Sequence, residues 1–161
     1  MEFDVVVEVP RGSRNKYEID QETGVIRLDR QLFTAVHYPA EYGFIEGTLS
    51  EDGDPLDALV VIDEPTFPGC RIACRPICVC SMRDEKGPDD KVLALPTWDL
   101  VHEWDDLHDV PPRVLAEIRH FFHIYKDLEE GKYTEVGDWA GRVSAEEVIR
   151  QAAKRYRGGE A

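Results

Sequence analysis

The sequence predicts a mixed, β-rich α+β fold, a small sheet or barrel with two helices packed outside it. Three observations predict this class. Short apolar runs alternate with turn residues through the first two-thirds of the chain, which is typical of strands. After Pro111-Pro112 the apolar spacing becomes helical, and a second helical stretch follows Ser144. The 161 residues contain no internal repeat, low-complexity stretch or linker, so we expect one domain over residues 1–161.

The strand pattern is clearest where apolar runs end at turn residues. The first run is rich in valine and is broken by Pro10 and Gly12. Glu22-Thr23-Gly24 separates the next two runs and predicts a hairpin turn. The acidic segment 84–90 joins the last two. The predicted strands are residues 4–9, 16–19, 25–28, 56–62, 71–82 and 91–95.

The final third of the chain predicts two helices. Pro111-Pro112 opens the first, and apolar residues recur at helical spacing over residues 114–125. Ser144 and Glu147 have the spacing of a capping box, which predicts the start of the second, and Gly158-Gly159 ends it. In the second helix we expect the inward residues to be Val148, Ile149, Ala152 and Tyr156.

The chain is strongly acidic, with 33 acidic and 19 basic residues and a net charge of −14. Such a surface repels nucleic acid and anionic membrane, so neither is expected as a partner. An anionic substrate must therefore arrive with cations or meet a local basic cluster. No apolar run approaches the length of a membrane span, and the acidic N-terminus is unlike a signal peptide, so we expect a cytoplasmic location.

Four cysteines lie close together, at positions 70, 74, 78 and 80. Their spacing lacks the paired Cys-x-x-Cys knuckles of zinc ribbons, which favours small buried hydrophobic residues over a zinc site. Even steps along the chain predict that Cys74, Cys78 and Cys80 share one face of a strand, joined by Cys70 if the strand extends that far. The sequence leaves open whether these thiols carry redox control.

The most informative stretch is Asp52-Gly53-Asp54-Pro55-Leu56-Asp57. Three aspartates this close repel one another unless a cation offsets their charge, and Mg²⁺ prefers carboxylate and water oxygens. The alternative is a solvated turn, because Asp, Gly and Pro are common turn residues. An EF-hand is excluded, because Leu56 and Asp57 stand where its loop needs an oxygen ligand and a glycine.

A second acidic loop, residues 84–91, also lies beside an apolar strand. A polar hairpin loop is the alternative interpretation, but Glu8 and Glu18 add to a set of carboxylates that could converge. Basic and tyrosine side chains accompany them, and a carboxylate–metal side facing a cationic side suits phosphoryl transfer. No P-loop is present, which argues against a nucleotide-driven ATPase. The accompanying residues are Lys16, Arg30, Tyr42, Lys91, Tyr125 and Lys126.

At these residues the chain resembles the soluble inorganic pyrophosphatases of the single-domain, magnesium-dependent family. The segment 52–58 resembles the family signature without a mismatch, and further motif residues follow in the family's order from Glu8 to Lys126. Bacterial members, and actinobacterial ones in particular, are the most similar. The further motif residues are Glu8-Val9-Pro10, Lys16-Tyr17-Glu18, Arg30, Tyr38-Pro39, Tyr42-Gly43-Phe44-Ile45, Asp84-Glu85, Asp89, Lys91 and Tyr125-Lys126.

The resemblance implies a five-stranded OB-like β-barrel flanked by two main helices, homohexamer assembly and hydrolysis of pyrophosphate by a metal-activated water. It implies several Mg²⁺ ions per site, with Mn²⁺ or Zn²⁺ as substitutes. Asp52, Asp57 and Asp89 would bind the tighter ion, and Asp57 would also reach a second. The implied metal ligands are Glu8, Glu18, Asp52, Asp57, Asp84 and Asp89. The implied phosphate-binding residues are Lys16, Arg30, Tyr42, Lys91, Tyr125 and Lys126.

For the general base, Asp54 is the first candidate, because the resemblance leaves it least committed to metal, and Asp89 is the second. The segment 97–109 carries no family signature. Its His102 and His108 are either ligands of an extra site or parts of a surface loop, and we expect a loop. Two rival functions remain: a non-catalytic magnesium or polyphosphate binder, and a nucleoside-polyphosphate hydrolase.

Overall fold

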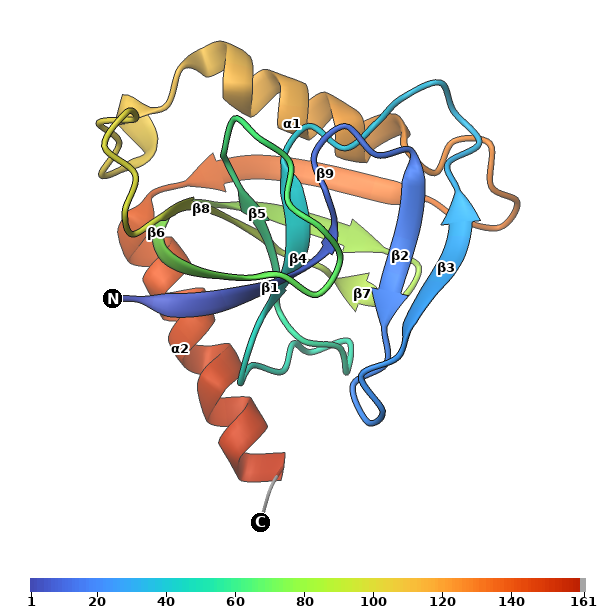
Figure 1. Cartoon of the computed structure of the whole chain (residues 1–161), viewed down its shortest axis with the longest axis horizontal. Coiled ribbons are helices and arrows are strands. Elements are labelled where there is room, and N and C mark those ends of the chain that lie inside the picture. Colours follow the sequence, from blue (N-terminus) through green and yellow to red (C-terminus); the bar gives the residue numbers. More distant parts are fainter. Residues whose placement is uncertain (160–161) are drawn as a thin grey trace.

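The computed structural model describes residues 1–159 and shows a closed ring of strands with two flanking helices (Figure 1). One sheet has the order β1-β4-β5-β8-β6-β7, with β9 added on β6. Because β1 also pairs with β6, five strands (β1, β4, β5, β8 and β6) close into a ring, whereas β2 and β3 form a separate hairpin. The strands are β1 Phe3–Val9, β2 Asn15–Ile19, β3 Ile26–Gln31, β4 Glu41–Ile45, β5 Asp57–Val60, β6 Arg71–Asp84, β7 Gly87–Pro88, β8 Lys91–Pro96 and β9 Thr134–Ala140. The helices are η1 Leu107–Asp109, α1 Pro112–Ile124 and α2 Arg142–Gly159.

The predicted mixed, β-rich fold with two main helices is confirmed, and the six predicted strands all exist. Three strands, β4, β9 and the two-residue β7, were not predicted. Strand β4 is buried at every residue, so it lacks the alternation that marks a half-exposed strand. It also contains Gly43, where an added Cβ would lie 2.0 Å from the carbonyl oxygen of Val6. A side chain at position 43 would therefore prevent β4 from pairing with β1.

The predicted common face of the cysteines is wrong. The pairing of β6 with β8 shifts register between Pro76 and Cys78, and such a bulge inverts the alternation of side chains beyond it. Cys74 therefore packs in the cluster that contacts α2, whereas Cys78 and Cys80 pack in the cluster that contacts α1. The bulge also accommodates Pro76, which has no N–H to donate to a ladder.

The prediction that the cysteines are small buried hydrophobic residues holds for three of them. Cys74, Cys78 and Cys80 are buried free thiols, and Cys70 is half-buried. Burial raises the pKa of Cys74 and Cys78 to about 12 and that of Cys80 to about 11. These thiols are therefore protonated at neutral pH.

Helix α1 begins as predicted at Pro112, but the predicted start of α2 is wrong. Helix α2 begins at Arg142, so Ser144 lies inside it and caps nothing. The Asp106 carboxylate, from the segment before η1, instead accepts a hydrogen bond of 2.8 Å from the backbone N–H of Arg142. A residue distant in the chain thus caps the N-terminus of α2 in place of the predicted local capping box. The buried residues of α2 are Ala145, Ile149 and Ala152, whereas Tyr156, expected to face inward, is 40% exposed.

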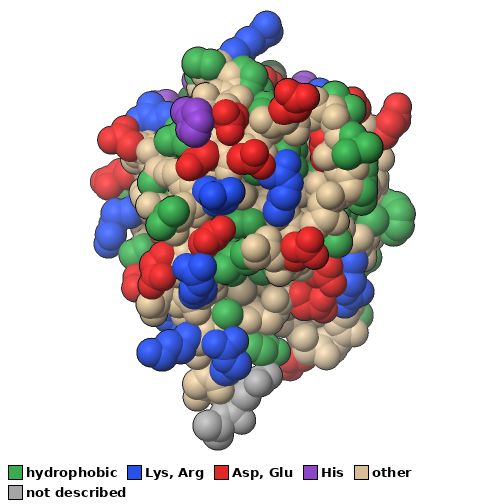
Figure 2. All heavy atoms as spheres, turned by 90° about the vertical axis from the view of Figure 1, so that its left-hand side faces the viewer, with side chains coloured by type: hydrophobic (Ala, Val, Ile, Leu, Met, Phe, Trp, Pro, Cys, Tyr) green, Lys and Arg blue, Asp and Glu red, His purple; other side chains and the backbone are tan. Residues whose placement is uncertain are grey.

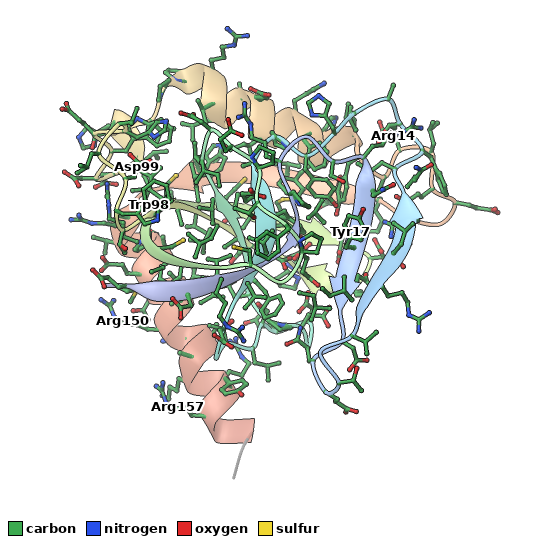
Figure 3. The ribbon with its side chains drawn as sticks, viewed as in Figure 1. Arg14, Tyr17, Trp98, Asp99, Arg150 and Arg157 are labelled. Carbon is green, nitrogen blue, oxygen red and sulfur yellow. The ribbon has the colours of Figure 1, made fainter. Side chains whose placement is uncertain are left out.

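The segment 97–109 lies far from β2 across the molecule, as the labels of Trp98, Asp99 and Tyr17 show in Figure 3. Most of it is a surface loop, as expected, although Trp104 is buried against the α1 cluster. His102 is held by Asp99, with 2.9 Å between Nδ1 and Oδ2. On the face shown in Figure 2, acidic and basic side chains are interspersed. Within residues 1–159, no helix has the length and apolarity needed to cross a membrane.

Candidate active site

A cavity of about 370 Å³ brings together side chains from the hairpin, the ring and the end of α1. All thirteen residues that the sequence singled out as metal-binding, phosphate-binding or catalytic line it. In total nine carboxylates and six cations line this cavity, so the acidic chain does contain a local basic cluster. The thirteen are Glu8, Lys16, Glu18, Arg30, Tyr42, Asp52, Asp54, Asp57, Asp84, Asp89, Lys91, Tyr125 and Lys126.

Strand register places Lys91 at the centre of the site. Asp57 on β5 pairs directly with Lys91 on the parallel strand β8, and β4 runs along the other edge of β5. The buried Lys91 Nζ donates to Tyr42 Oη at 2.8 Å, Asp57 Oδ2 at 2.6 Å and Asp89 Oδ2 at 3.0 Å. Its three protons are thus shared among three site residues, which satisfies a charge that would otherwise be costly to bury.

The signature segment turns sharply so that its carboxylates can approach the cavity. Gly53 has a φ of +91°, which only glycine adopts readily. The backbone N–H of Asp54 donates to Asp52 Oδ1 at 3.0 Å, and the carbonyl of Asp54 accepts from Ser50 N at 2.7 Å. This turn leaves Asp52 half-buried and Asp54 exposed, so the Asp54 carboxylate is the more accessible to water.

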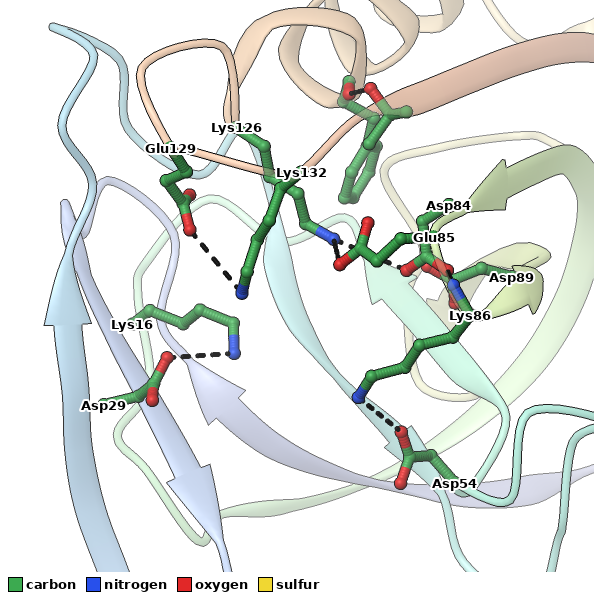
Figure 4. Close-up of polar contacts among 12 residues, drawn as sticks. Lys16, Asp29, Asp54, Asp84, Glu85, Lys86, Asp89, Lys126, Glu129 and Lys132 are labelled. Carbon is green, nitrogen blue, oxygen red and sulfur yellow. Dashed lines mark hydrogen bonds and ion pairs between the residues drawn. The ribbon is translucent and has the colours of Figure 1, made fainter.

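The second acidic loop folds back on the strand that precedes it. Gly87, with a φ of +115°, and Pro88 form the short strand β7 on β6, and Asp89 N donates to Met82 O at 2.9 Å. Asp84 is buried, and its Oδ2 lies 3.4 Å from Lys126 Nζ at the end of α1. This second acidic segment therefore contacts the signature segment through Lys86 and Asp54, and it contacts the end of α1 through Asp84 and Lys126 (Figure 4).

Burial and neighbouring charges shift the pKa of several carboxylates in the cavity. Burial raises the pKa of Glu8 to about 7 and that of Asp57 to about 6. Burial acts on Asp89 in the same direction, but the neighbouring Lys91 outweighs it and lowers the pKa of Asp89. Carboxylates whose charge is this incompletely compensated are characteristic of functional sites.

The donor set fits hard divalent cations. Every candidate ligand is a carboxylate oxygen, and no cysteine or histidine lines the cavity, which suits Mg²⁺ better than softer metals. Among the described residues no three such side chains already converge in a ligand arrangement, because Lys91 lies between Asp57 and Asp89. A bound cation would therefore compete with Lys91 for these carboxylates.

Three residues of the cavity were given no role by the reasoning from sequence. Asp29 lies 3.5 Å from Lys16 Nζ, and Lys86 Nζ lies 4.0 Å from Asp54 Oδ2 (Figure 4). Lys132 lines the cavity from the loop after α1. Asp29 could have been noticed beside Arg30 in a strand, but nothing in the sequence around Lys132 indicates a site.

A cavity beside a closed ring of strands in which carboxylates and cations lie together is typical of one class of protein, the enzymes that act on phosphate with divalent metal ions. Comparison with known proteins identifies the family. The chain belongs to the inorganic pyrophosphatase family, whose profile matches residues 5–157.

Similar proteins span nearly the whole chain. The inorganic pyrophosphatase of Streptomyces coelicolor is 58% identical over 158 residues, which cover 98% of this chain and 97% of that protein. The crystal structure of the inorganic pyrophosphatase from Thermus thermophilus matches with a TM-score of 0.92 and 47% identity, covering 97% of this chain and 91% of that one. The Helicobacter pylori inorganic pyrophosphatase matches with a TM-score of 0.94 and 41% identity, covering 97% and 94%. The predicted resemblance, including its actinobacterial character, is confirmed.

Proposed function

We propose that this chain hydrolyses inorganic pyrophosphate to two phosphates with a water activated by divalent metal ions, Mg²⁺ foremost, with Mn²⁺ or Zn²⁺ as substitutes. The observation that carries the proposal is the cavity that nine carboxylates and six cations line together. Neither half suffices alone, because the carboxylates would repel pyrophosphate and the cations would not activate water. Family membership supports the same reaction.

On the acidic side, we assign Asp52, Asp57 and Asp89 to the tighter metal ion. Glu8, Glu18 and Asp84 would hold further ions that arrive with substrate. Bound Mg²⁺ would polarise phosphoryl oxygens and lower the pKa of water towards neutrality. The residues of the chain would fix the positions of these ions and exchange contacts with Lys91 as the ions bind.

On the cationic side, six residues would bind the phosphate oxygens and stabilise the charge on the leaving phosphate. They are Lys16, Arg30, Tyr42, Lys91, Tyr125 and Lys126. Burial raises the pKa of Tyr42 and of Tyr125, so both phenols remain hydrogen-bond donors at neutral pH. Lys126 Nζ lies 5.4 Å from the centre of the Tyr125 ring, so the two residues approach the substrate together.

Asp54 is the favoured general base. It is exposed and its nearest cation, Lys86, is 4.0 Å away, so its carboxylate is free to accept a proton from water. Asp89 is the second candidate, but Lys91 lowers its pKa, which makes it a poorer proton acceptor than an ordinary aspartate.

We further propose a cytoplasmic homohexamer. Large apolar side chains remain exposed in the described chain, notably Trp98, Leu100 and Val101 in one loop. Assembly of copies would cover such surface. Light scattering after size-exclusion chromatography tests this assembly, and a monomeric mass would refute it.

Phosphate release from pyrophosphate, measured while Mg²⁺ is titrated from zero, tests the function. We expect no release without metal and saturable release with it. A magnesium or polyphosphate binder would release nothing at any concentration. ATP serves as the competing substrate under the same conditions, and faster hydrolysis of ATP than of pyrophosphate would favour a nucleoside-polyphosphate hydrolase.

A further inference from the structure

Glu129 is a buried carboxylate that lies behind the cationic side of the cavity. Its side chain is only 6% exposed, and it is not among the residues that line the cavity. The mechanism proposed above does not use it. Burying an unpaired charge to this degree would destabilise the fold, so the partners of Glu129 indicate its role.

Its main partner is the phosphate-binding candidate Arg30, 99 positions away in the sequence. Glu129 Oε1 lies 2.9 Å from Arg30 Nε, and Arg30 Nη2 donates to Oε2 at 3.2 Å. Only the Nη2 contact has hydrogen-bond geometry, whereas the Nε contact is a close ion pair, and together they hold the guanidinium against Glu129. Glu129 Oε1 also lies 3.7 Å from Nζ of Lys132, which lines the cavity (Figure 4).

Backbone turns after α1 place Glu129 beside the site. Tyr125 caps α1, and the next residues continue as successive turns. Glu129 N donates to Lys126 O at 2.9 Å, and Lys132 N donates to Glu129 O at 3.4 Å. Gly131, with a φ of +75°, permits the second turn. One short segment therefore carries two lysines of the cavity and the carboxylate that reaches Arg30.

We propose that Glu129 is a positioning residue that holds Arg30 and Lys132 in the orientation that binds a phosphate group of the substrate. The inference rests on the proposed function. Glu129 occupies the Nε–Nη2 edge of Arg30, while Nη1 is turned towards Asp29, a residue of the cavity wall. Because Glu129 does not line the cavity, it acts through these cations. A carboxylate that only neutralised the cations would have the opposite effect, because it would weaken substrate binding.

Glu129→Gln distinguishes these two effects, with Glu130→Gln as the matched control. Glu130 is adjacent and exposed, and no ion pair involves it among residues 1–159. We expect Glu129→Gln to raise the KM for pyrophosphate about 10-fold, with a smaller change in kcat, as for other residues that orient binding groups. Calorimetry should show a similar loss of affinity for inorganic phosphate but unchanged Mg²⁺ binding without phosphate. Glu130→Gln should match the wild type.

A double variant provides the second test. If Glu129 acts through Arg30, Arg30→Lys combined with Glu129→Gln should be little worse than Arg30→Lys alone. An unchanged or lower KM for Glu129→Gln, or fully additive losses in the double variant, would overturn the inference. If Glu129→Gln does not fold, Glu129→Asp keeps the charge but is too short to span both nitrogens, and wild-type KM in that variant would refute it equally. No phosphate release by the wild-type enzyme would refute the proposed function instead.

Discussion

Glu8→Gln tests whether the ionised Glu8 carboxylate destabilises the folded protein when no metal is bound. Burial raises the pKa of Glu8 from 4.5 to about 7, so the folded protein binds this proton more tightly than the unfolded chain does. The stabilisation from this group is complete below pH 4.5 and is lost as the pH rises through about 7. Since one pKa unit corresponds to about 1.4 kcal/mol, the difference between the two ends of this window is about 3 kcal/mol at most.

The glutamine variant removes this proton linkage while keeping an acceptor for the backbone N–H of Ile19, which donates to Glu8 at 2.8 Å. Urea unfolding in EDTA between pH 4.5 and 8 measures the difference. We expect the variant to be more stable than the wild type at pH 8, by up to about 3 kcal/mol, and the advantage to shrink towards pH 4.5. Excess Mg²⁺ should reduce the advantage by stabilising the wild-type carboxylate. Equal pH dependence of the two proteins in EDTA would refute the reasoning.

Three further predictions concern turnover, thiol reactivity and capping. Asp57→Asn should lower kcat by about two orders of magnitude or more with an unchanged circular dichroism spectrum, and near-normal turnover would contradict the metal assignment. In the native protein only the half-buried Cys70 should react quickly with a thiol reagent, and the other three thiols only after denaturant is added, so four fast thiols would be contrary evidence. Asp106→Ala removes the acceptor for Leu107 N at 2.7 Å and Arg142 N at 2.8 Å. It should lower the Tm by about 2–4 °C, whereas Glu103→Ala, which changes an exposed carboxylate of the same loop, serves as the control, and equal Tm values would show that the cap is dispensable.

The sequence alone singled out residues that line the cavity. Asp52, Asp57 and Lys91 are recognisable because acidic and basic residues interrupt or border apolar strands, where burial of charge needs a reason. Helix α1 was also predictable, because its apolar spacing and its opening prolines are local signals. The apolar spacing of a helix depends on residues that are neighbours in the chain, which is why this element could be predicted locally.

Only the tertiary structure decided how these parts meet. The bulge at Pro76 depends on the partner strand, the cap of α2 comes from Asp106 36 positions away, and Glu129 reaches Arg30 across 99 positions. Register likewise pairs Asp57 with Lys91 through a parallel ladder that no local pattern encodes. Contacts between residues distant in the chain are not predictable from local patterns, because their geometry is set by the backbone of the elements between them.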